Sequence, residues 1–228
     1  MAVQDQLIKY NESDIPINFV SMAVYLNEDK LPFHAAILVR HLSNDYLFHY
    51  PGGEPPKIEV LQNVELENIL VYKILENFDT EEDGDVGSFL QYCKRVCAES
   101  DITYGFIVDN SRYLQDGRYQ SLSELPEIAS CVGFCLNVLA NTILDINDSY
   151  FKLDEWDDSG VNQRYDLWAQ QEARRKYPSL DWNKYNAFKK RISPLEYLAA
   201  SFCQEYPITK DHLVPIISEI DSKLQTII

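Results

Sequence analysis

Three side chains of this sequence are of the types that combine in nucleophilic catalysis: Cys131, His34 and His49. A thiol attacks a carbonyl carbon when a base within hydrogen-bond reach takes its proton and a further group orients that base. Backbone N–H groups then stabilise the oxyanion. In this interpretation Cys131 is the nucleophile, His34 the base and His49 the orienting group. The alternative is structural for all three, because buried cysteines and histidines are often packing residues.

Residues 131–144 are predicted to form a buried helix. Ser130 is a suitable N-cap, and a thiol in the first turn lies in the partial positive charge of the helix end, which favours the thiolate. The backbone around Cys131, near the small Gly133, would supply the oxyanion donors. Cys135, one turn further in, is expected in the core. Apolar residues recur at helical spacing, at Val132, Leu136, Leu139 and Ile143.

The two histidines are expected on neighbouring strands, residues 33–40 and 46–50, joined by Ser43-Asn44-Asp45. A hairpin around that loop pairs residues whose numbers add up to about 88, which sets His34 near Glu54 rather than near His49. The imidazoles would then meet only if a bulge shifts the register or the sheet twists strongly.

The rest of the chain predicts an α+β fold. It consists of an antiparallel β-sheet packed on the helix that bears the cysteine, within residues 1–145, followed by a helical C-terminal subdomain at 146–228. Residues 1–14 are expected to be irregular and 109–125 a loop. The further predicted strands are 15–26, 58–61, 69–74 and 104–108, and the further predicted helices are 86–98, 164–176, 182–191, 194–204 and 210–227.

Charge and composition narrow the classes of partner. The 228 residues are 46% hydrophobic and carry a formal net charge of −16, which favours a packed core and argues against nucleic acid or an anionic membrane surface as partner. A basic protein partner is compatible with this charge. No apolar run is long enough to span a membrane and no secretory signal is visible at the start, so a cytoplasmic location is expected.

No cofactor or metal is expected. The acidic loop 79–85 lacks the ligand spacing of an EF-hand. The cysteine pairs Cys93/Cys97 and Cys131/Cys135 are spaced as neighbours on helices rather than as zinc ligands.

Three segments resemble the motifs of circularly permuted papain-like cysteine enzymes, the superfamily of permuted NlpC-type peptidases and lecithin:retinol acyltransferase-like proteins. They are His34-Ala35-Ala36-Ile37-Leu38-Val39, Tyr46-Leu47-Phe48-His49 and Cys131-x-x-Phe134. The resemblance covers about residues 15–145, with Ser130 standing where that group usually has asparagine. It implies Cys131 as nucleophile, His34 as base, His49 as third member, and a peptide, isopeptide or acyl-containing substrate.

Three hypotheses therefore stand. The first is a cytosolic thiol hydrolase or acyltransferase that attacks an amide, ester or thioester carbonyl through Cys131. The second is a non-enzymatic acidic interaction protein of the inhibitor or immunity type. The third is a degenerate member of the same fold that only binds.

Overall fold

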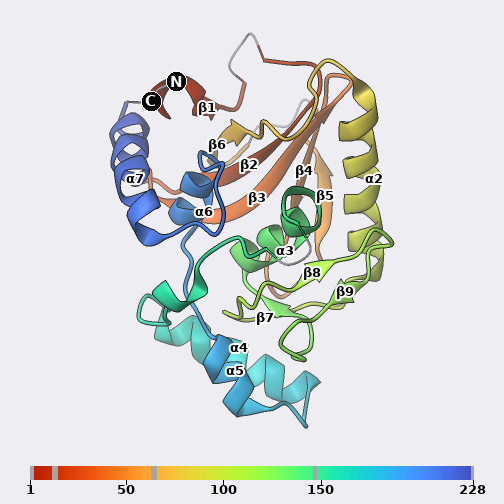
Figure 1. The fold of residues 1–228 in the computed structure, drawn as a ribbon, viewed down its shortest axis with the longest axis vertical. Coiled ribbons are helices and arrows are strands. Elements are labelled where there is room, and N and C mark those ends of the chain that lie inside the picture. The colour runs from red at the N-terminus through yellow and green to blue at the C-terminus, as the bar shows by residue number, and fades with distance from the viewer. Residues whose placement is uncertain (1–2, 12–14, 63–65, 146–147, 227–228) are drawn as a thin grey trace.

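A six-stranded antiparallel sheet forms the centre of the molecule in the computed structural model, which describes residues 3–11, 15–62, 66–145 and 148–226 (Figure 1). The predicted α+β class, with an antiparallel sheet and a helical C-terminal region, is confirmed. Along the sheet the strands lie in the order β1 (Ile8–Lys9), β6 (Ile69–Ile74), β2 (Phe19–Leu26), β3 (Pro32–His41), β4 (Asn44–His49) and β5 (Lys57–Val60).

The β3–β4 hairpin turns at Leu42 and Ser43, earlier than the sequence predicts. Both residues have positive φ angles, 49° and 62°, as in a two-residue type I′ turn. The backbone N–H of Leu42 is held by the Asn18 side chain at 2.9 Å. Paired residue numbers therefore add up to 85, as in Ile37 with Phe48, so the predicted sum of about 88 was wrong.

This register brings the two histidines together without a bulge between β3 and β4. Continued by one residue, it sets His49 opposite Ala36, two residues from His34 along β3. Because side chains two residues apart share a face of a strand, His34 is a diagonal neighbour of His49 on that face.

The main hydrophobic core lies between one face of the sheet and three helices. The helices are α2 (Asp83–Glu99), α3 (Cys131–Ile143) and α6 (Pro194–Ala200), and each of them contacts β3. Alternate β3 residues, Ala35, Ile37 and Val39, face this core, whereas Ala36 and Leu38 face a smaller cluster on the other side. Helix α7 (Lys210–Leu224) packs against α6 and the short α1 (Val3–Gln6).

A smaller helical unit extends beyond one end of the sheet (Figure 1). It contains α4 (Gln163–Lys176) and α5 (Trp182–Phe188), preceded by the 3-10 turn η1 (Leu153–Glu155). Helix α4 contacts β7 (Thr103–Tyr104), which pairs in parallel with β10 (Ile128–Ala129). A further hairpin joins β8 (Arg112–Tyr113) to β9 (Tyr119–Gln120).

Several predicted boundaries differ from the structure. The expected irregular lead-in was wrong over the residues described, because it contains α1 and β1, and β1 pairs with β6. The expected loop at 109–125 contains β8 and β9, and the last three predicted helices end three to four residues early. One core cluster combines side chains from both sides of residue 145, and the division of the chain there stays a prediction.

Candidate active site

Cys131 is the first residue of α3. Ser130 caps the helix, with its Oγ accepting a hydrogen bond from the Gly133 N–H at 3.3 Å. Three residues on from Cys131, the Phe134 ring packs against Phe48 of β4, with ring centroids 5.1 Å apart. The cap and this aromatic contact hold the start of α3 beside the open end of the β3–β4 hairpin, opposite its turn.

The Cys131 thiol lies near the backbone of β3 and of the start of α3. The backbone N–H groups of Ala35, Val132 and Cys131 act on it electrostatically and lower its pKa. Pairing between β3 and β4 ends at Ile37 with Phe48, so the thiol lies just beyond the last paired residues. Ala35 directly follows His34 along β3.

The imidazoles of His34 and His49 are in direct contact. His34 Nε2 lies 2.8 Å from His49 Nδ1, with the rings nearly perpendicular at 85°. His49 Nε2 in turn lies 3.5 Å from Oε1 of Glu59 on β5, a long electrostatic contact rather than a well-formed hydrogen bond. Lys57 holds the same carboxylate oxygen at 2.8 Å.

The position of Glu59 indicates which ring nitrogens of His34 and His49 carry hydrogen. A carboxylate near His49 Nε2 favours the tautomer with its hydrogen there, which leaves Nδ1 as an acceptor. His34 Nε2 must then donate, and the lone pair of His34 lies on Nδ1. Within the described residues His34 Nδ1 makes no hydrogen bond, so this nitrogen is available as a base.

Cys131 and His34 line the same cavity, whose volume is about 490 Å³. No hydrogen bond joins Sγ to an imidazole nitrogen in the described part of the chain, and such bonds are often long in unliganded enzymes. The cavity walls are rich in aromatic rings, and three of these rings are substantially exposed: Phe33 (49%), Tyr165 (57%) and Trp168 (36%).

Burial sets the charge states of Cys131 and His34. It lowers the pKa of His34 to about 4, with His49 contributing in the same direction and Glu59 opposing. Burial also raises the pKa of Cys131, against the Ala35 N–H, Arg191 and the helix start. The helix end therefore acts on the thiol in the expected direction, but burial outweighs it. Near neutral pH the two groups are a neutral thiol and a neutral imidazole.

The pKa values of His49 and Glu59 are also lowered. Burial lowers the pKa of His49, opposed by Glu59. Burial would raise the pKa of Glu59, but Lys57 and His49 hold it below its ordinary value, so the carboxylate is charged.

Other thiols have a different environment. Cys135 is fully buried, as predicted for a core residue, and burial raises its pKa. Cys97 and Cys203 are partly exposed, and neither lines the cavity of Cys131.

Four residues of the site were not predicted as functional: Glu59, Arg191, Trp168 and Tyr104. Tyr104, the first residue of the predicted strand 104–108, lines the cavity and packs against Trp168, with ring centroids 5.1 Å apart and the rings tilted by 40°. Arg191 and Trp168 lie in the C-terminal region, more than thirty residues from Cys131, and no local pattern connects them to it.

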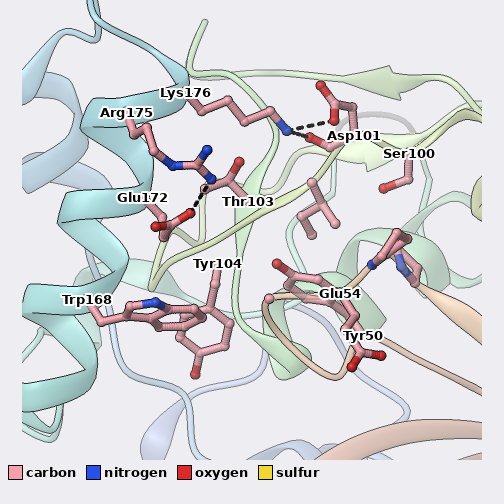
Figure 2. Close-up of a pocket in the computed structure, with 14 residues that line it drawn as sticks. Tyr50, Glu54, Ser100, Asp101, Thr103, Tyr104, Trp168, Glu172, Arg175 and Lys176 are labelled. Atoms are coloured by element: carbon pink, nitrogen blue, oxygen red, sulfur yellow. Dashed lines mark hydrogen bonds and ion pairs between the residues drawn. The ribbon is translucent and has the colours of Figure 1, made fainter.

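Tyr104 and Trp168 also line a second, smaller pocket of about 200 Å³ (Figure 2). Gly53, with φ of 78°, lies where a Cβ would come within 3.6 Å of Trp168. Four charged side chains of this pocket form two ion pairs, and Glu54 lines it as a further carboxylate. Arg175 Nη2 lies 2.6 Å from Glu172 Oε2, and Lys176 Nζ lies 2.8 Å from Asp101 Oδ1 (Figure 2).

Comparisons with protein-family models, curated proteins and solved structures find no match for this chain. Over the ranges that the structure describes, no three histidine, cysteine or acidic side chains gather closely enough to hold a metal ion. In the same ranges, none of the helices has the length and apolar character needed to cross a membrane.

Proposed function

We propose that this protein is a thiol hydrolase or acyltransferase that attacks an amide, ester or thioester carbonyl through Cys131. The observation that carries the proposal is the 2.8 Å contact between His34 Nε2 and His49 Nδ1. His34 and Cys131 line the same cavity, and in this tautomer His34 Nδ1 has no hydrogen-bond partner among the described residues. The proposed nucleophile and base thus line one cavity, and the proposed orienting group contacts the base.

The neutral charge state determines the first step. His34 Nδ1 takes the thiol proton as Sγ forms a bond to the carbonyl carbon, and the carbonyl oxygen becomes the oxyanion. The N–H groups of Cys131 and Val132, at the start of α3, are proposed as backbone donors for it. The imidazolium then returns the proton to the leaving group as the carbon–heteroatom bond breaks, which leaves an acyl group on Sγ.

The second step releases the acyl group. Water or an acceptor gives its proton to His34 Nδ1 and attacks the acyl carbon. The C–S bond then breaks, and the imidazolium returns the proton to Sγ, which regenerates the thiol and the neutral imidazole. His49 accepts from His34 Nε2 throughout, and Glu59 favours that tautomer of His49. The imidazolium formed in each step is stabilised by the same chain of contacts.

The permuted papain-like fold is part of this proposal. Supporting it are the order of His34, His49 and Cys131 along the chain, the contact between α3 and β3, and the packing of Phe134 against Phe48. The cytoplasm would keep the thiol reduced.

Labelling with a thiol-directed electrophile tests the proposal. Iodoacetamide labelling at Cys131 should slow roughly tenfold or more in His34→Gln near neutral pH, because the base is lost. His212→Gln is the matched control, since that exposed histidine lies on α7. Labelling at the partly exposed Cys203 should be the same in all variants. Equal labelling rates at Cys131 in wild type and His34→Gln would refute the proposal.

A protein that binds at this cavity without catalysis is the second candidate. The raised pKa of Cys131 and the absence of a hydrogen bond from Sγ to an imidazole favour it. Binding without turnover of amides, esters and thioesters would support this candidate. A basic protein partner for the acidic surface also stays a proposal, and its binding should weaken as salt is raised.

A further inference from the structure

The cavity beside Cys131 has a charge opposite to that of the chain. The formal net charge is −16, yet no aspartate or glutamate is among the described residues that line this cavity. Arg191 is the permanently charged residue among them. His34 adds no charge near neutral pH, because its pKa is lowered to about 4. The cavity therefore has a single positive charge.

Among the described residues, the guanidinium of Arg191 donates one hydrogen bond. Nη1 donates to the Ile192 carbonyl at 2.6 Å, and Cζ lies 5.9 Å from the centre of the Phe106 ring. No carboxylate in the described part of the chain lies within ion-pair distance of it. Nε and Nη2 have no acceptor among the described residues. By contrast, Arg175 in the neighbouring pocket is already paired with Glu172 (Figure 2).

Local structure holds Arg191 in this position. Its backbone N–H donates to the Asp157 carbonyl at 2.7 Å. A Cβ at Gly160 would lie 3.2 Å from Arg191 Cγ, so the absence of a side chain there leaves room for the aliphatic part of the arginine. The charge acts on the thiol as well, since Arg191 lowers the pKa of Cys131 against burial. Arg191 is thus held where it can act on a molecule bound next to Cys131.

We propose that the molecule Cys131 attacks carries a carboxylate that Arg191 binds, with its apolar part against the exposed aromatic rings of the cavity. The proposal rests on the proposed function. Two parallel donors on a planar guanidinium match the two oxygens of a carboxylate. One unshared cation balances one negative charge, whereas a phosphate dianion would leave a charge uncompensated. Phe33, Tyr165 and Trp168 provide the apolar surface.

The first test compares two reagents that differ in charge. Iodoacetate and iodoacetamide alkylate thiols by the same chemistry, so the ratio of their rates at one cysteine cancels the reactivity of the thiol. We expect the iodoacetate-to-iodoacetamide ratio at Cys131 to exceed that at Cys203 by roughly fivefold to tenfold. Arg191→Gln should abolish the difference, Arg191→Lys should retain most of it, and Arg175→Gln should leave it unchanged. An unchanged ratio in Arg191→Gln would overturn the proposal.

The second test is independent of the chemistry at Cys131. In Cys131→Ala protein, calorimetric titration should show that N-acetylphenylalanine binds roughly tenfold more tightly than its amide. Arg191→Gln should remove this preference and Arg175→Gln should not. Equal affinities for the acid and the amide would overturn the proposal.

The two tests separate this proposal from the proposed function. A charge preference that depends on Arg191, together with Cys131 alkylation that does not depend on His34, would sustain the anion site and refute the thiol enzyme. Alkylation that depends on His34, with no effect of Arg191 in either test, would refute only the anion site.

Discussion

Replacing His34 by glutamine should change how the stability of the protein depends on pH. In the folded state burial lowers the pKa of His34 to about 4, from an ordinary value of 6.5. As pH falls below 6.5, the unfolded chain binds a proton at this residue before the folded chain does, so stability is lost. The loss accumulates between about pH 6.5 and pH 4. Two pKa values 2.5 units apart correspond to a full loss of about 3 kcal/mol, of which about 2 kcal/mol is reached at pH 5.

Urea unfolding at pH 8 and pH 5 measures this contribution. Between these two pH values the free energy of unfolding of wild type should fall by about 2 kcal/mol more than that of His34→Gln, because glutamine does not titrate. Glutamine also keeps an N–H donor for His49 Nδ1, which limits other effects of the change. The control is His212→Gln, which replaces an exposed histidine on α7 far from this pair in the sequence. The same pH dependence in His34→Gln and wild type would show that the His34 imidazole titrates normally. It would refute the conclusion that burial keeps this imidazole neutral.

Three further predictions concern the same site. Iodoacetamide alkylation of Cys131 should keep accelerating above pH 8, because burial raises its pKa; a plateau between pH 5 and pH 7 would indicate a thiolate–imidazolium pair instead. Glu59→Gln should slow labelling of Cys131 roughly threefold to tenfold. It should change the free energy of unfolding by less than about 1 kcal/mol, since Glu59 is 39% exposed. An unchanged labelling rate would mean that Glu59 does not affect the histidine pair. Phe134→Ala should cost about 3–5 kcal/mol in urea unfolding, because the ring is fully buried against Phe48, and a loss below about 1 kcal/mol would contradict that packing.

Regular patterns in the sequence predicted the elements that hold the site. Residues 33–40, 69–74 and 131–144 were located to within a residue or so of β3, β6 and α3, because alternating or helically spaced apolar residues mark buried faces. Ser130 was predicted as the N-cap, and its Oγ has that role. These features depend on residues that are close together in the sequence, so the sequence pattern is enough to predict them.

Features that depend on the turn or on distant residues were not predicted. The hairpin register was missed because Leu42 and Ser43 take positive φ angles without the glycine or asparagine that usually marks such a turn. Strand β1 has only two residues and is defined by its pairing with β6 rather than by its own sequence. Arg191 reaches the cavity of Cys131 only through the tertiary fold.

Detection of an acyl-enzyme would show whether Cys131 is a nucleophile. The protein is incubated with an activated ester such as p-nitrophenyl acetate, quenched in acid and mapped by peptide mass spectrometry. We expect one acyl group on the peptide that contains Cys131 in wild type, and roughly tenfold slower formation in His34→Gln. An acyl group on Cys203 instead, or equal rates of formation on Cys131 with and without His34, would contradict this expectation.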